Sequence, residues 1–164
     1  MRPVASYVED LLRRGQHHFT TQDAVEALGG RRSAVARALA RLKAKGQLAT
    51  PQRGFYVAVP PEYRSLGCLP PEQFVPQMME RVGEVYHVSL LSAAAYHGAA
   101  HQRPQRFQVM VSKPRAPIEC GKVRVDFHVR SDLTQVAVVV LNTPRGHVRV
   151  SSPEATALEL VGYA

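Results

Sequence analysis

Glycines divide the start of the chain into three short helical segments, and this pattern restricts the fold more than any other feature. Residues 4–14 repeat apolar side chains at helical spacing. Gly15, Gly29 and Gly46 stand where successive helices are expected to end, because glycine readily adopts the left-handed conformation of helix C-termini. Three short helices joined by a glycine turn predict a helix-turn-helix.

The second and third helices have recognisable starts. Residues 19–21, Phe-Thr-Thr, supply hydroxyl groups that can cap the second helix, which is expected to end at Gly29. We expect the third helix to run from Ser33, as its N-terminal cap, to Lys45. On a helical wheel its apolar side chains share one side, which is predicted to pack on the first two helices: Val35, Ala38, Leu39 and Leu42.

A β-hairpin is expected directly after these helices. Residues 48–50 and 55–58 are short apolar runs with high β-propensity, and residues 51–54, Pro-Gln-Arg-Gly, are typical of a turn. The hairpin would be a wing beside the third helix. Residues 1–60 are therefore predicted to form a winged helix-turn-helix domain that binds DNA.

The distribution of charge favours a polyanionic partner for this first domain. Residues 1–58 hold ten Lys or Arg against four acidic residues, which is +6 of the net +8 of the whole chain. Between Arg31 and Arg53 there are seven basic residues and no acidic one. Such a one-sided cluster is the electrostatic pattern of a nucleic-acid-binding surface.

The polar side of the third helix provides the predicted base contacts. It combines small residues with arginines, so the helix could settle into a major groove. The predicted base-reading residues are Ser33, Arg37 and Arg41. Other residues are predicted to contact phosphates or to act from the wing: Thr21, Gln22, Arg31, Arg32, Lys43, Lys45, Gln52 and Arg53.

Residues 61–164 are expected to form a second, α+β domain with a largely antiparallel sheet, after a proline-rich boundary near residue 62. One expected helix, residues 71–82, has Pro76 inside it, and the last expected helix begins at residues 152–154, Ser-Pro-Glu. The remaining expected elements are a helix at 89–97 and strands at 107–112, 122–130, 136–141 and 146–150. The expected fold class is thus α+β throughout.

No residue pattern in the sequence predicts catalysis, a metal or a cofactor. His97 and His101 have the spacing of a helical metal pair but lack the glutamate of a metalloprotease. Glu119, Lys122 and Asp126 faintly resemble a nuclease cluster, yet their spacing departs from the usual one, and a solvated sheet face explains them better. We therefore expect a protein that is not an enzyme.

The two cysteines, Cys68 and Cys120, are too few for a secreted disulfide scaffold and lack the spacing of a zinc site. The first residues contain no apolar leader, and no run of eighteen apolar residues occurs. These features favour a cytoplasmic protein without a membrane span.

Four segments together resemble the AbiEi-type antitoxins of bacterial abortive-infection, type IV toxin–antitoxin systems. They are residues 19–21, residues 54–57 (Gly-Phe-Tyr-Val), residues 88–98 (Val-Ser-Leu-Leu-Ser-Ala-Ala-Ala-Tyr-His-Gly) and residues 150–156 (Val-Ser-Ser-Pro-Glu-Ala-Thr). The second domain of that family usually continues further, so this chain is either truncated or a short member.

The resemblance implies a two-domain antitoxin and transcriptional repressor. Its winged helix would bind double-stranded DNA at inverted repeats in its own operon promoter, and its second domain would support antitoxicity and cooperative DNA occupancy through self-association. The toxin would be a nucleotidyltransferase-like protein. Two alternatives remain open at this point: a DNA-processing enzyme targeted by the winged helix, and a winged-helix regulator or adaptor outside a toxin–antitoxin operon.

Overall fold

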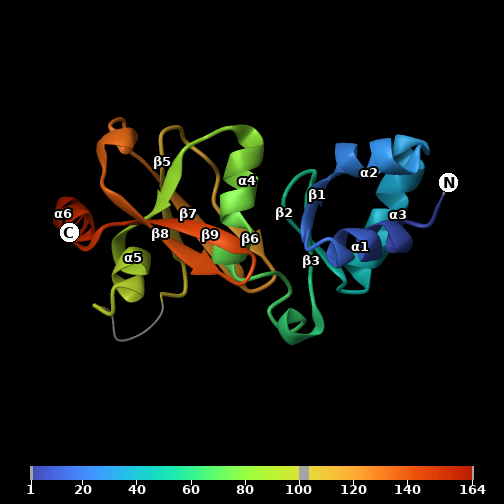
Figure 1. The fold of residues 1–164 in the computed structure, drawn as a ribbon, viewed down its shortest axis with the longest axis horizontal. Coiled ribbons are helices and arrows are strands. Elements are labelled where there is room, and N and C mark those ends of the chain that lie inside the picture. Colours follow the sequence, from blue (N-terminus) through green and yellow to red (C-terminus); the bar gives the residue numbers. More distant parts are fainter. Residues whose placement is uncertain (1, 100–103, 164) are drawn as a thin grey trace. The chain divides into compact units, whose positions relative to one another are not determined.

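The computed structural model describes residues 2–99 and 104–163. The chain forms two compact units (Figure 1). Unit 1 consists of Met1–Pro70 with Cys120–Lys122, and unit 2 of Pro71–Glu119 with Val123–Ala164. Compact packing does not show that either part folds alone, so the domain division expected between residues 60 and 61 stays a prediction.

The described part of unit 1 contains three helices and a small antiparallel sheet of three strands (Figure 1). The helices are α1 (Val4–Arg13), α2 (Thr21–Leu28) and α3 (Arg32–Ala44). The strands are β1 (His18–Thr20), β2 (Leu48–Gln52) and β3 (Phe55–Ala58), in the order β1-β3-β2. A short 3-10 helix, η1 (Pro61–Tyr63), follows the sheet. Strand β1 was not predicted from the sequence.

The core of unit 1 is apolar and includes the predicted side of α3. Val35, Leu39 and Leu42 are buried there, and Ala38 is half-buried against them, which confirms the helical-wheel prediction. The rings of Tyr7 on α1 and Phe19 on β1 meet edge to face, with their centroids 5.5 Å apart. Burial of this side fixes which side of α3 faces outward.

The helix starts differ from the prediction at α3. Thr20 caps α2 as expected: its Oγ1 accepts the Asp23 backbone N–H at 3.0 Å, and its own N–H donates to the Asp23 carboxylate at 2.9 Å. Ser33, however, is not the cap of α3. Gly29 ends α2 in a left-handed conformation, and the extended Arg31 is the N-cap residue of α3, so Ser33 lies within the helix.

The hairpin turn is shorter than expected. Strand β2 continues through Pro51 to Gln52, leaving only residues 53–54 between the strands. The pairing of β2 with β3 shifts register between Ala49 and Gln52. Pro51 lies in this irregular stretch, where a residue without a backbone N–H interrupts no ladder hydrogen bond.

Unit 2 is built on a six-stranded mixed sheet in the order β6-β7-β5-β4-β9-β8. The strands are β4 (Tyr86–Val88), β5 (Phe107–Val111), β6 (Ile118–Cys120), β7 (Val123–Val129), β8 (Val138–Thr143) and β9 (Gly146–Ser151). The expected α+β class is confirmed, but the expected largely antiparallel sheet is not. Two pairs, β4 with β9 and β5 with β7, are parallel.

The helices of unit 2 are α4 (Val75–Val82), α5 (Leu90–Tyr96) and α6 (Pro153–Gly162), with short 3-10 helices η2 (Pro71–Gln73) and η3 (Leu133–Gln135). The expected helix over 71–82 is broken at Phe74, and Pro76 lies in the first turn of α4, where its missing N–H has no helical partner to lose. Ser152 caps α6 by accepting the Ala155 N–H at 3.1 Å. Within residues 2–99 and 104–163, every helix is too short or too polar to cross a bilayer.

Candidate nucleic-acid interface

The exposed side of α3 carries the three predicted base-reading residues. Ser33, Arg37 and Arg41 follow each other at intervals of four, so they form one line along the helix. All three are exposed, whereas the opposite side of the helix is buried in the core of unit 1. The structure therefore presents these residues together to the outside.

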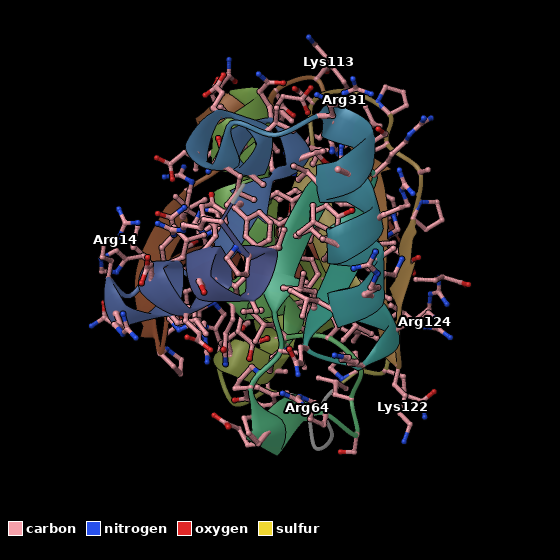
Figure 2. The ribbon with its side chains drawn as sticks, turned by 90° about the vertical axis from the view of Figure 1, so that its right-hand side faces the viewer. Arg14, Arg31, Arg64, Lys113, Lys122 and Arg124 are labelled. Atoms are coloured by element: carbon pink, nitrogen blue, oxygen red, sulfur yellow. The ribbon has the colours of Figure 1, made fainter. Side chains whose placement is uncertain are left out.

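The predicted phosphate contacts surround this line at both ends of α3. Arg31 and Arg32 are exposed at its start, and Figure 2 shows Arg31 there. Lys43 and Lys45 are exposed where the helix ends. At the hairpin turn Arg53 is also exposed, and the neighbouring Gln52 of β2 is half-buried.

The hairpin turn is fastened to the start of α2. The Thr21 backbone N–H donates to the carbonyl oxygen of Gly54 at 3.0 Å, and Gly54 has a φ of +79° that side chains larger than hydrogen rarely allow. Thr21 is half-buried and its N–H is already used inside the unit. The bond holds the turn, and Arg53 with it, in a defined position.

Gln22 and Arg32 bind each other across the gap between α2 and α3. The Arg32 Nη1 donates to Gln22 Oε1 at 3.0 Å, and Gln22 Nε2 donates to Glu26 Oε1 at 2.9 Å. Both polar atoms of the Gln22 amide are thus engaged within unit 1. Gln22 holds the Arg32 guanidinium, and its exposed amide keeps a second N–H and a second oxygen lone pair for a further contact.

The acidic residues of unit 1 do not neutralise this surface. Asp10 pairs with arginines on and next to α1, Asp23 completes the cap of α2, and Glu26 accepts the Gln22 amide. Six cations of the predicted interface have no ion pair with any carboxylate of residues 2–99 and 104–163: Arg31, Arg37, Arg41, Lys43, Lys45 and Arg53. Their charge is available to an external anion.

In unit 2 the two segments that carry the sequence resemblance are neighbours. Val88 pairs with Val150 where β4 runs parallel to β9. Beyond these strands, His97 Nε2 lies 2.7 Å from the carbonyl oxygen of Ser151, and Ser151 Oγ lies 2.7 Å from Thr156 Oγ1. Residues 88–98 and 150–156 therefore form one structural core rather than two separate motifs.

Residues 87–164 match the family model of the AbiEi antitoxin C-terminal domain. The match covers slightly less than half of the chain and includes both of those segments. The match agrees with the resemblance to AbiEi-type antitoxins noted in the sequence, and it supports an antitoxin role in a toxin–antitoxin system. None of the curated proteins matches this chain.

The matched region, residues 87–164, contains a buried pair of ionisable side chains that the sequence did not predict. His87 Nε2 and Glu159 Oε2 are 2.9 Å apart, and each side chain is only 1% exposed. The Arg130 Nη1 lies 3.5 Å from the same Glu159 oxygen. The sequence offered one signal of a buried charge, which is Glu159 within an otherwise apolar stretch of α6. Its partner, His87, lies 72 residues away, so the sequence did not point to the pair.

Three of the residues considered above as catalytic or metal-binding candidates form hydrogen bonds or an ion pair inside the protein. His97 binds the Ser151 carbonyl, and His101 lies outside the described residues. Asp126 accepts two hydrogen bonds from the Arg106 guanidinium at 2.6 and 2.7 Å, which lower the pKa of its carboxyl below the ordinary value. Glu119 lies 3.7 Å from Arg124. Across residues 2–99 and 104–163, His, Cys, Asp and Glu side chains form no cluster of three or more suited to a metal.

Proposed function

We propose that this protein is an antitoxin that also represses its own toxin–antitoxin operon, with unit 1 binding operator DNA as a winged helix-turn-helix. The observation that carries the proposal is the outward line of Ser33, Arg37 and Arg41 on α3. It lies on a surface whose cations have no carboxylate partners among the described residues. A helix of this shape and charge suits the major groove of a duplex.

Each part of unit 1 has a role in this proposal. Helix α3 is the recognition helix, and Arg37 and Arg41 read base edges, because a guanidinium can bind guanine through two hydrogen bonds. The β2–β3 hairpin is the wing, held by the bond from Thr21 to Gly54. The remaining predicted contacts neutralise phosphates or act from the wing: Thr21, Gln22, Arg31, Arg32, Lys43, Lys45, Gln52 and Arg53.

Unit 2 is the antitoxic part of the proposal. The AbiEi match supports a toxin partner, which we infer to be a nucleotidyltransferase-like protein. Inverted repeats present two equivalent half-sites, so two copies of the chain would occupy one operator and associate on it. The role is regulatory rather than enzymatic, uses no cofactor, and belongs in the cytoplasm where the operon is transcribed.

The repressor role is tested by competition between two DNA duplexes. Inverted repeats from the protein's own promoter should bind at least about a thousandfold more tightly than a random duplex of equal length, at physiological salt. The matched control is Arg14→Ala, which removes an exposed arginine next to α1, away from α3 (Figure 2). This control should bind like the wild type. Equal affinity of the wild type for the two duplexes contradicts sequence-specific repression.

The antitoxin role is tested separately by co-expression with the toxin gene of the same operon. Growth should be restored by the wild type and also by Arg37→Ala, because the proposal assigns antitoxicity to unit 2. Loss of rescue in a folded Arg37→Ala variant would contradict this division of labour.

A further inference from the structure

The two cysteines of this protein, far apart in sequence, meet inside unit 1. Cys68 follows η1, and Cys120 begins the segment Cys120–Lys122, which belongs to the same unit. The side chains of Cys68 and Cys120 lie within reach of each other and interact. Cys68 is fully buried, Cys120 is 8% exposed, and both are free thiols.

The backbone segments that carry the two cysteines lie close together. The Lys122 N–H donates to the Leu66 carbonyl oxygen at 2.8 Å. A Cβ atom on Gly121 would lie 2.3 Å from that same oxygen, so no larger residue fits without moving the backbone. Gly67 and Gly121 also have positive φ angles of +73° and +56°. Two glycines thus allow the segments that carry the sulfur atoms to pack directly on each other.

The surroundings of Cys120 favour its thiolate. Its sulfur accepts hydrogen bonds from the Cys68 thiol and from the Thr50 backbone, and the Lys43 ammonium group adds a positive charge. These contacts lower the pKa of the Cys120 thiol although burial opposes them. Thr50 lies in the irregular stretch of β2, between the paired residues Ala49 and Gln52.

Cys68 has the complementary environment. Its contact with the Cys120 side chain and its burial both raise the pKa of the Cys68 thiol. The first of these causes disappears once the Cys120 sulfur is covalently modified and no longer carries a negative charge. The pair therefore combines one nucleophilic sulfur with a second thiol that becomes easier to deprotonate after the first has reacted.

We propose that Cys68 and Cys120 are a redox-active dithiol that closes to an intramolecular disulfide by exchange with a low-molecular-weight disulfide. The Cys120 thiolate attacks one sulfur of the small disulfide, forming a mixed disulfide and expelling one small thiolate. Cys68 then gives up its proton to that thiolate and attacks Cys120, expelling the second small thiolate, which takes up the proton that Cys120 had released. One small disulfide is reduced to two small thiols, and two protein thiols are oxidised to one disulfide.

The disulfide would close a loop over residues 69–119 and restrict the unfolded chain. It should therefore raise the Tm by an amount on the order of 10 °C relative to the reduced protein. The groups beside Cys120 come from α3 (Lys43) and β2 (Thr50). The proposal does not depend on DNA binding.

The first test uses the folded wild-type chain and oxidised glutathione as the probe. Intact-mass analysis should show a loss of about 2 Da without a retained glutathione, reversed by a reductant, and peptide mapping should link Cys68 to Cys120. A chain that keeps one or two glutathiones, forms disulfide-linked dimers, or stays reduced would overturn the proposal.

Three variants identify which sulfur reacts first, after circular dichroism has shown that each is folded. Cys68→Ser keeps a hydroxyl donor to Cys120 and should accumulate a single glutathione adduct. Cys120→Ser should react at least about tenfold more slowly at pH 7. Cys68→Ala, which removes the donor, should react more slowly than Cys68→Ser. Equal rates for Cys120→Ser and Cys68→Ser would refute the assignment of Cys120 as the nucleophile.

Discussion

The two units of this protein differ in where their polar and charged groups lie and in whether these groups are paired. In unit 1 the described core around α3 is apolar apart from the buried Cys68–Cys120 pair, and the cations around α3 are exposed without carboxylate partners. Unit 2 pairs its surface charges, as Arg106 with Asp126 and Arg130 with Asp132. It also contains all the buried polar residues of the described chain: Gln73, His87, Ser89, Ser92, Ser151, Thr156 and Glu159.

This difference indicates where each unit uses its polar groups. A buried polar group is costly unless it is matched, so the polar groups of unit 2 serve mainly its own structure. An exposed and unpaired cation adds little to stability, so the cations of unit 1 are available for a polyanion. Substitutions should therefore affect stability in unit 2 and DNA affinity in unit 1.

The largest expected effect is on the stability of unit 2 through Glu159→Ala. The substitution leaves His87 buried without its carboxylate and should cost about 3–5 kcal/mol of unfolding free energy. Chemical denaturation measures this cost. The control is Leu158→Ala on the same helix, where the side chain is 75% exposed and the expected change is within about 0.5 kcal/mol. Similar costs for the two variants would remove the contrast between the units.

The next effect is on DNA affinity through Arg37→Ala or Arg41→Ala. Either variant should lose about 1–3 kcal/mol of binding to the operator and relax its sequence preference, while the unfolding free energy stays within about 0.5 kcal/mol of the wild type. Lys45→Ala is the comparison, because loss of a phosphate contact should weaken operator and random duplex alike. Titrations with both duplexes distinguish the two classes, and identical behaviour would contradict the assignment of base contacts.

A smaller effect tests the helix cap that contributes to the stability of unit 1. Thr20→Ala removes the side-chain cap of α2 and should cost about 1 kcal/mol of unfolding free energy. Thr20→Ser keeps the hydroxyl group and should restore most of that stability. If the two variants were equally destabilised, the hydroxyl group would not be the stabilising element.

The sequence predicted those parts of unit 1 that depend on local pattern. The buried side of α3 followed from helical periodicity at Val35, Leu39 and Leu42. Strand β1 was missed because the three residues of His18–Thr20 are too few to show an alternation. Pro51 was assigned to the turn because proline favours turns, yet it is tolerated in β2 where the pairing is irregular.

Contacts between distant parts of the chain could not be predicted in the same way. His87 meets Glu159 over 72 residues, and neither periodicity nor spacing encodes that meeting. The two cysteines likewise carried no signal of proximity. The residue pattern predicted strands at Phe107–Val111 and Val123–Val129, but it did not predict that they pair in parallel. Alternation of apolar and polar residues shows which face of a strand is buried, whereas it carries no information on the direction of the neighbouring strand.

The smallest expected effect tests whether the surface pairs of unit 2 belong to its own stability. The hydrogen bonds from Arg106 lower the pKa of Asp126 below the ordinary value of 3.8. Because the folded-state pKa is the depressed one, the contribution is present above pH 3.8 and is lost as the pH falls through the folded value. Arg106→Gln should therefore lower the Tm by about 1 °C at pH 6 and by less as the pH falls below 3.8, since the pair is partly exposed to solvent. Asp126→Asn is the matched variant, and its Tm should approach the wild-type Tm in the same way as the pH falls.

A Tm difference between Arg106→Gln and the wild type that persisted unchanged in acid would mean that Arg106 acts through packing rather than through Asp126. The contrast in charge pairing between the two units would then be weaker at this position.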